Sequence, residues 1–485
     1  MRSTKLESRA DIGARSQVAD LPSLFAHSRR YGLLNLQYAI VFSFLIALVG
    51  GLIGSLTGCQ AAVNGRERLA NAAPREVLRI GTSGDYSPFS RWPADESEPA
   101  GFSISIARAY AEVRGVDLAW IHFAWPELAI DLEADRFDFA VSGITVRPDR
   151  STRGRFSLPV TTSGAIALVH KASPIESTED LDRSTLRIAV NAGGHLERVA
   201  RRLFPSARIH PVANNAEVLD QLLHGHADAV LTDTLEAPHW QRIAETRLRT
   251  IGPFTRDRKA AWFSVDRAGE VERFNRWLLA TEASGELGRL RDRFDLPSER
   301  TASPLPALLA SLDERLALMR AVADAKQVLG IATENLEREE LVLDGANEGV
   351  RRAAERAGIE VPNSLAIRRL FRTQIEAAKW IQTRHRATLP TESNSTDRKA
   401  NGVAQRELEQ VIRPALIFLG DRISMLLVAC IESDVRSLSQ AIVHEALASH
   451  ELPDRHLQAI HQALSEIFLA EPRAGHRSSH AHTIQ

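Results

Sequence analysis

Three groups of residues have the types and spacing expected of sites for small anions. Arg315 and Lys326 are eleven residues apart, which is close to three helical turns, so on a helix both side chains point the same way. Arg150 carries a planar guanidinium fork that matches a carboxylate bidentately. Glu197 follows a Gly-Gly pair, where the backbone can approach a ligand and a helix start favours anions. These residues indicate carboxylate binding and proton transfer.

Each of these patterns also has an ordinary structural explanation. Cations on a helix commonly form a solvated face, and a lone arginine commonly lies on the surface. A glutamate in the first turn of a helix stabilises the helix dipole without any further role. Whether these residues form a site therefore depends on the helices and strands that position them.

The segment 77–298 alternates short apolar runs with longer amphipathic ones, which predicts parallel sheets flanked by helices. Two such series, 77–170 and 171–257, predict two lobes, and 258–298 returns to the first. The expected strands are 77–83, 118–125, 138–143, 186–194 and 227–233, and the expected helices include 101–115, 126–137 and 195–204.

The sequence after the Pro/Ser-rich stretch "TASPLP" (301–306) predicts no strands. Apolar residues recur there with helical period, so we expect a linker at 299–309, an all-α domain at 310–470 and a disordered tail at 471–485. The expected helices are 307–330, 337–358, 363–387 and 405–431, followed by a shorter helical pair at about 437–470.

Composition excludes several classes of protein. The apolar share is 44% and the charged share 25%, which are ordinary globular values. Sixty basic residues balance 61 acidic ones, so no net field attracts nucleic acid. Two cysteines exclude a disulfide framework and a cysteine-rich zinc site. The histidines near the C-terminus (His476, His480 and His482) fit no fixed metal cage, and we expect no metal or organic cofactor.

The N-terminus has the pattern of an export signal. Residues 38–57 contain no charged residue and follow Arg29 and Arg30, so this run can span a bilayer with the rest of the chain outside the cytoplasm. The run ends in Leu-Thr-Gly-Cys59, which resembles a bacterial lipobox. The resemblance implies that Cys59 is lipidated and anchors the chain; an uncleaved membrane helix is the alternative. We expect a signal or anchor at 1–59, a tether at 60–76 and a periplasmic, membrane-tethered protein.

The motifs "LRIGTSGDYSPFS", "FDFAVSGITVRPDRSTRGRFSLPV" and "ADAVLTDTLEA" resemble those of periplasmic solute-binding proteins of the amino-acid-binding type. The resemblance implies a two-lobed α/β fold of the periplasmic-binding-protein type II at 77–298, with the ligand in the cleft between the lobes. It implies that Thr145 and Arg150 hold the ligand's carboxylate. Asp233 matches the position that binds an α-amino group in such proteins.

Within that family, "GDYSPFS", "RFDFAVSGI", "VNAGGHLERVAR" and "LTDTLEA" are most similar to cyclohexadienyl dehydratases. These convert prephenate to phenylpyruvate, or arogenate to phenylalanine. The resemblance implies that Glu197 donates the proton to the departing hydroxyl. Because the helix start lowers a carboxylate's pKa, Glu197 needs burial in the cleft to stay protonated. Three further residues lie on segments that resemble the dehydratase cleft: Asp85, Trp125 and Lys259.

The helical segments "DERLALMRAVADAK", "NLEREELVL", "QIEAAKWIQ" and "GDRISMLL" resemble the secreted all-helical chorismate mutases. Their reaction, chorismate to prephenate, needs a folded conformer and stabilised charge on the breaking ether oxygen. The resemblance assigns three arginines to the carboxylates, two donors to the ether oxygen and one acid to the substrate hydroxyl: Arg315, Arg338 and Arg422; Lys326 and Gln382; and Glu339.

Two positions depart from that pattern and one cysteine is left unpaired. Asn335 stands where these mutases usually have Asp, and Ala378 where a small hydroxyl residue is common. Both changes put substrate contacts in doubt without removing a principal cation. We expect Cys430 to be a buried free thiol.

The two resemblances fit together, because the product of the mutase reaction is the substrate of the dehydratase. They predict an exported bifunctional enzyme acting on chorismate, prephenate or arogenate, with a homodimer through the helical domain as one arrangement. Two alternatives remain open. In the first, the α/β part is a solute-binding module without dehydratase activity. In the second, the helical part is an inactive dimerisation unit.

Overall fold

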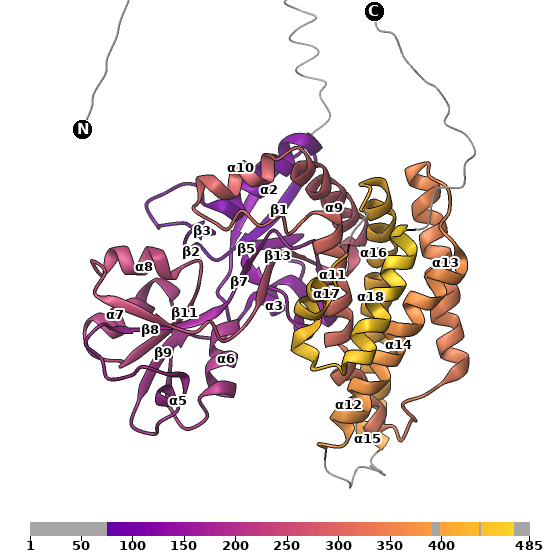
Figure 1. Ribbon diagram of the computed structural model, residues 1–485. Helices are drawn as coiled ribbons and strands as arrows, with labels where there is room; N and C mark the ends of the chain where they lie inside the picture. Colours follow the sequence, from indigo (N-terminus) through magenta and orange to yellow (C-terminus); the bar gives the residue numbers. More distant parts are fainter. Residues whose placement is uncertain (1–74, 390–397, 436–437, 470–485) are drawn as a thin grey trace, which may run out of the picture. The chain divides into compact units, whose positions relative to one another are not determined.

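The computed structural model describes residues 75–389, 398–435 and 438–469 (Figure 1). The expected export signal, Cys59, most of the tether and the expected tail at 471–485 lie outside these residues. The described residues from 75 onward form one compact unit.

The first lobe is built on a mixed sheet. Its strand order is β4 (Asp117–His122), β1 (Val77–Thr82), β5 (Phe139–Thr145), β13 (Asp257–Phe263) and β6 (Arg155–Phe156), and β7 (Thr161–Ser163) also pairs with β13. A separate two-stranded ladder joins β2 (Asp85–Tyr86) and β3 (Ser90–Arg91). The helices are α2 (Phe102–Arg114), α3 (Leu128–Glu133), α4 (Pro148–Arg153), α9 (Ala268–Ala283) and α10 (Glu286–Arg293).

The central strand β5 shows why this sheet forms. All seven of its residues are buried, as expected of a strand covered on both faces. Helix α2 buries one stripe, with Phe102, Ile106 and Tyr110 at four-residue spacing. β5 therefore delivers its last residue, Thr145, to the carboxyl end of the sheet from a rigid position.

The second lobe has its own five-stranded sheet. The strand order is β10 (Arg208–Val212), β9 (Arg187–Asn191), β11 (Ala229–Asp233), β8 (Ala165–His170) and β12 (Leu248–Ile251). Its helices are α5 (Thr178–Leu181), α6 (His195–Leu203), α7 (Val218–Leu223) and α8 (Ala237–Ile243), with a short 3-10 turn, η1 (Asn215–Glu217). The chain passes between the lobes once before β8 and once before β13 (Figure 1).

The two-lobed α/β architecture is confirmed, but two details of the prediction are wrong. Strand β8, expected in the first lobe, pairs with β11 and β12 and so belongs to the second. Neither sheet is purely parallel, because β8, β12 and β13 run antiparallel to their neighbours. Alternation of strands and helices in the sequence does not reveal a strand that enters a sheet directly from the other lobe.

The region after the two lobes is helical, as predicted. Its helices are α11 (Pro304–Ala317), α12 (Met319–Val328), α13 (Leu336–Ala357), α14 (Ser364–Arg386), α15 (Arg398–Arg406), a π-helical turn η3 (Glu407–Ile412), α16 (Arg413–Glu432), α17 (Gln440–Leu447), a 3-10 turn η4 (Ala448–His450) and α18 (Asp454–Leu469). Cys430 is buried and free, which confirms the expected thiol.

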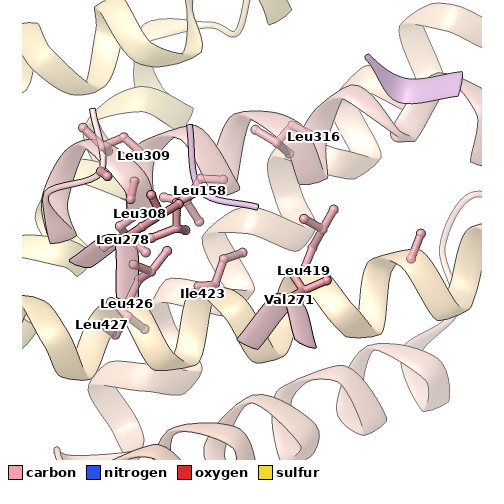
Figure 2. Packing of buried hydrophobic residues seen from close by; sticks show 14 of the residues in the cluster. Leu158, Val271, Leu278, Leu308, Leu309, Leu316, Leu419, Ile423, Leu426 and Leu427 are labelled. Atoms are coloured by element: carbon pink, nitrogen blue, oxygen red, sulfur yellow. The ribbon is translucent and has the colours of Figure 1, made fainter. Parts of the chain in front are cut away.

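The expected linker at 299–309 is wrong. From Pro304 this stretch is the first part of α11, and Ala307, Leu308 and Leu309 are buried. They join one apolar core that contains Leu158 and Leu278 of the first lobe as well as Leu426 of α16 (Figure 2). Prolines at the first turn of a helix are tolerated because their missing N–H is not needed there. The Pro/Ser-rich stretch therefore begins a helix and is not a linker.

One helical stretch in the described part of the chain, Arg398–Glu432, is long and apolar enough to cross a membrane by length and composition alone. Half of its most apolar window is buried in the protein. Its apolar side chains include Leu419, Ile423 and Leu427 in the core that α11 shares (Figure 2).

Candidate functional site

The cleft between the two lobes is nearly closed. Between the lobes lies a void of about 40 Å³ that is partly open to solvent and has room for a few water molecules at most. A ligand with a six-membered ring therefore enters only when the lobes separate. The residues that line the void come from both lobes: Tyr86, Trp125, Gly143, Thr145, Arg150 and Lys259 from the first, and Asn191, Gly194, His195, Leu196 and Asn215 from the second.

Lys259 is the centre of the contact between the lobes. Its ammonium group lies 2.9 Å from the Asp233 carboxylate and donates to the Tyr86 hydroxyl and the Thr145 hydroxyl, at 3.0 Å each. The Tyr86 hydroxyl also donates to Asp233. Burial, and then the charge of Asp233, raise the pKa of Tyr86 well above its ordinary value, so it stays a neutral donor. Lys259 thus has three partners within the protein, two hydroxyl groups and one carboxylate.

A second set of hydrogen bonds crosses the cleft through Asp85. The Trp125 indole donates to one oxygen of this carboxylate at 3.0 Å, and the backbone N–H of Asn215 donates to the other at 3.1 Å. The Asn215 side chain donates to the Asp85 carbonyl at 3.2 Å and to Glu236 at 2.8 Å. Asp85 and Trp125 are therefore hydrogen-bonded to each other at the cleft. Both lie on the segments that resemble the dehydratase cleft.

Arg150 is buried beside the void without a carboxylate partner. Its guanidinium donates to the Thr145 carbonyl at 3.2 Å, and 4% of the residue is exposed. The neighbouring acid, Asp149, pairs instead with Arg147 at 2.8 Å and Arg198 at 3.3 Å. Burial, and then the charge of Arg147, lower the pKa of Arg150 well below its ordinary value. Asp149 acts on Arg150 only through its charge, so among the described residues Arg150 is a buried cation without a directly paired carboxylate, which is costly unless a ligand supplies one.

Glu197 differs from the expectation in its protonation. Its carboxylate accepts from the Gly193 N–H at 2.7 Å and from the Arg201 guanidinium at 2.7 and 2.9 Å. Partial burial raises its pKa, but these hydrogen bonds and the charge of Arg201 outweigh burial and hold the pKa below its ordinary value. The closed arrangement therefore does not supply the burial that Glu197 needs to stay protonated, and Glu197 does not line the void.

Two further titratable groups near the cleft were not singled out from the sequence. Glu236 is buried and accepts from the Thr232 hydroxyl at 2.7 Å, and burial together with the charge of Asp233 raises its pKa well above its ordinary value. His195 lines the void and pairs with Asp257 at 2.9 Å; burial lowers its pKa. Both stand inside the quoted motifs, but no residue type or spacing marked them.

In the helical region, two of the predicted residues are buried with unsatisfied polar atoms. One guanidinium nitrogen of Arg315 has no hydrogen-bond partner among the described residues, and burial lowers the pKa of Arg315 to about 10. The Gln382 amide donates weakly to the Met319 sulfur at 3.6 Å, and its carbonyl oxygen has no partner. Met319 stands four residues after Arg315. Such orphaned polar atoms are rare in folded proteins.

Lys326 lies in a cluster of cations that the sequence did not reveal. Its ammonium group donates to the Thr333 carbonyl at 2.7 Å. Burial, and then the charges of Arg386 and Arg413, lower its pKa. Arg386 donates to the Thr333 hydroxyl at 3.3 Å. Glu339 also acts on Lys326 electrostatically.

The remaining predicted mutase residues lie in different surroundings. Arg422 is buried, pairs with Glu314, and donates to the Ser311 hydroxyl at 3.0 Å and to the Phe156 carbonyl of the first lobe at 3.1 Å. Its charge is thus already neutralised. Arg338 contributes its backbone N–H to the Asn335 cap of α13 at 2.8 Å, and Asn335 serves as a helix cap.

The family model described as "Bacterial extracellular solute-binding proteins, family 3" matches residues 78–296. Cyclohexadienyl dehydratase of Pseudomonas aeruginosa is 33% identical over 225 residues, which is 45% of this chain and 83% of that protein. L-cystine-binding protein TcyJ of Escherichia coli strain K12 is 26% identical over 41% of this chain and 73% of that protein. Arginine-binding extracellular protein ArtP of Bacillus subtilis is 24% identical over 52% of this chain and 97% of that protein.

A solved structure is also similar in sequence. The ancestral amino acid-binding protein AncCDT-1, described as a precursor of cyclohexadienyl dehydratase, is 30% identical and covers 45% of this chain and 95% of that chain, with a TM-score of 0.43. The family match ends at residue 296, before the helical region begins at α11.

Proposed function

Since the chain belongs to the bacterial extracellular solute-binding proteins of family 3, we propose that its two-lobed part binds a small carboxylate in the cleft and acts as a cyclohexadienyl dehydratase. The observation that carries the proposal is Arg150, a buried guanidinium beside the void with no carboxylate partner among the described residues. The 33% identity to a cyclohexadienyl dehydratase supports the choice of reaction.

The proposed reaction balances without a cofactor. The bond from the ring to its carboxylate breaks and releases CO2, and its electron pair forms a ring double bond as the C–O bond to the hydroxyl breaks. The departing hydroxide takes a proton and leaves as water, and aromatisation provides the driving force. The protein has to hold the second carboxylate, which Arg150 does, and supply the proton.

Glu197 is the proposed proton donor, which requires a change from the closed arrangement. Its carboxylate has to leave Gly193 and Arg201 and lose water on ligand entry, because both partners stabilise the ionised form. When the lobes reclose over the substrate, burial beside the departing hydroxyl favours the protonated form. This assigns proton delivery to the liganded state alone.

We expect Glu197→Gln to lower kcat for prephenate by about 100-fold to 10,000-fold, the usual contribution of a general acid. The glutamine keeps the size of the side chain, so ligand binding should persist. The measurement is phenylpyruvate formation by the full-length chain, alongside calorimetric binding of phenylpyruvate. Arg202→Gln, on the exposed face of the same helix, is the control. Unchanged turnover in Glu197→Gln rules out this role.

The second candidate function of the two-lobed part is that of a solute-binding module without catalysis. Its support is that curated relatives include cystine-binding and arginine-binding proteins. Tight binding of an amino acid by the wild-type chain, with no product from prephenate or arogenate, would establish it in place of the dehydratase.

For the helical region we propose chorismate mutase activity. The support is the pair of orphaned buried atoms on Arg315 and Gln382 and the cations around Lys326, which suit a dianion. Arg338 and Glu339 are proposed to contact the substrate. Arg422 takes part only if its pairing with Glu314 is exchanged for a substrate carboxylate. The prephenate formed would then serve the dehydratase in the same chain.

We expect Lys326→Ala to lower mutase kcat by about 100-fold to 1,000-fold, because it removes a donor from charge that develops in the transition state. The mutase kcat is measured from the decrease in chorismate absorbance in the presence of the full-length chain. Lys399→Ala, on α15, is the matched control and should change little. A wild-type chain without mutase activity would identify the helical region as the inactive, dimerising alternative.

We further propose that the chain works outside the cytoplasm, tethered through lipidated Cys59 or an uncleaved N-terminal helix. The support is the description of the family as extracellular and the uncharged run at 38–57. A homodimer through the helical region is part of the same proposal.

A further inference from the structure

The residues that line the void in the cleft include cations but no acid. Among its eleven lining residues two are cations, Arg150 and Lys259, and none is an aspartate or glutamate. His195 adds no negative charge, and its partner Asp257 stands behind it, away from the lining. Asn191 and Asn215 are neutral. A ligand in this void therefore meets cations and neutral dipoles.

Asp233 is the acid that would receive a ligand's ammonium group, and it is fully engaged. One oxygen takes the Lys259 ammonium at 2.9 Å and the Tyr86 hydroxyl. The other accepts the backbone N–H groups of Leu235 at 3.0 Å and Glu236 at 3.1 Å. A carboxylate offers about four acceptor positions, and all four are used by protein donors.

The neighbouring acid Glu236 does not replace it. Its oxygens accept from Asn215 and from the Thr232 hydroxyl, and it is buried behind Asp233 rather than in the lining. Asp85 likewise accepts from Trp125 and from the Asn215 N–H. An ammonium group in the closed cleft thus finds the Asp233 carboxylate fully occupied, and the Glu236 and Asp85 carboxylates each already engaged with two protein donors.

We infer that this cleft selects carboxylates without an ammonium group, so that a 2-oxo acid binds in preference to the matching 2-amino acid, with Lys259 as the specificity-determining residue. Lys259 comes from β13 in the first lobe and Asp233 from β11 in the second, so each closure of the lobes remakes their ion pair. A ligand amine has to displace Lys259 and then sit beside it, whereas an oxo group leaves the pair intact. Like charges at such short range cost several kcal/mol.

This inference rests on the proposed placement of a carboxylate at Arg150, and it deepens the proposed function by naming prephenate over arogenate. It also differs from what the resemblance implied for Asp233, which matches a position that binds an α-amino group. The two ligands share the ring and both carboxylates and differ at the oxo or amino position, so their comparison isolates the effect of Lys259.

The test compares phenylpyruvate with L-phenylalanine by isothermal titration calorimetry on the full-length chain. Neither compound turns over in the proposed reaction, and they differ only at that position. We expect phenylpyruvate to bind at least about 30-fold more tightly to the wild-type chain, a modest part of the like-charge cost. In Lys259→Met, Asp233 loses its ammonium partner, and the preference should fall at least about tenfold or reverse.

Lys259→Arg keeps the charge and should keep the preference, so it serves when Lys259→Met folds poorly. Lys171→Met, on the surface of the second lobe, is the matched control and should leave the ratio unchanged. Equal or tighter binding of phenylalanine by the wild-type chain overturns the inference, as does an unchanged ratio in Lys259→Met.

Turnover separates this outcome from that of the proposed function. If prephenate is not converted but phenylpyruvate is still preferred through Lys259, the dehydratase proposal fails and the selectivity stands. If prephenate and arogenate are converted with equal kcat/KM, the dehydratase stands and the selectivity fails.

Discussion

Replacing Arg150 by leucine is expected to weaken binding of phenylpyruvate by about 30-fold to 5,000-fold. Truncating one side of a buried, hydrogen-bonded charge pair costs about 2–5 kcal/mol, and each 1.4 kcal/mol is a factor of ten in Kd. Arg150 lines the void and has no carboxylate partner among the described residues, so a ligand carboxylate would be that missing side. Turnover of prephenate should fall with binding.

The same substitution should make the ligand-free protein more stable. A buried guanidinium that lacks a counter-ion costs desolvation free energy, and leucine does not. We therefore expect Arg150→Leu to unfold at a higher temperature than the wild type without ligand and to lose the rise in Tm that phenylpyruvate gives the wild type. Differential scanning calorimetry with and without ligand measures both effects.

The control for Arg150→Leu is Arg153→Leu on the same short helix. Arg153 is exposed and pairs with Glu133 on the surface, where such pairs contribute little. It should change neither binding nor Tm by much. Loss of stability together with unchanged binding in Arg150→Leu would show that Arg150 is a structural residue and contradict the proposed function.

Replacing Glu282 by alanine is expected to lower the free energy of unfolding by about 3–5 kcal/mol, because it leaves a buried cation unpaired. Glu282 and Arg291 are both almost fully buried, and the guanidinium donates to Glu282 at 2.9 Å and to the Val160 carbonyl at 2.9 Å. Glu282 also accepts from the Ala302 N–H at 3.2 Å. The pair therefore fixes the stretch that leads into α11 against the first lobe.

Urea denaturation followed by circular dichroism measures this loss. Glu272→Ala, at a partly exposed position of the same helix with partners Arg276 and Arg356, should cost less than about 1 kcal/mol. The double variant Glu282→Leu with Arg291→Met should recover most of the stability, because an apolar pair replaces the ion pair without leaving a charge. A small effect of Glu282→Ala alone would mean that water or another group compensates Arg291.

Much of the fold was predictable because it depends on local patterns. The alternation of strands and helices, and the helical period after residue 306, follow from which residues must face a core. Strand β8 was assigned to the wrong lobe because its pairing with β11 and β12 is a contact across many residues of sequence. The prediction of a linker at 299–309 was wrong for the same reason, because its apolar side chains are buried by partners far along the chain.

The candidate site, too, was predictable only in part. The sequence by itself indicated candidate residues for the chemistry: Thr145 at the end of β5, Arg150 on α4 and Lys259 on β13, and Arg315 and Lys326, which stand eleven residues apart on α11 and α12. Only the tertiary structure decided their charge state and partners, because a pKa depends on burial and on neighbours in space. It left Arg150 without a carboxylate, joined Lys259 to Asp233 across the lobes and tied Glu197 to Arg201.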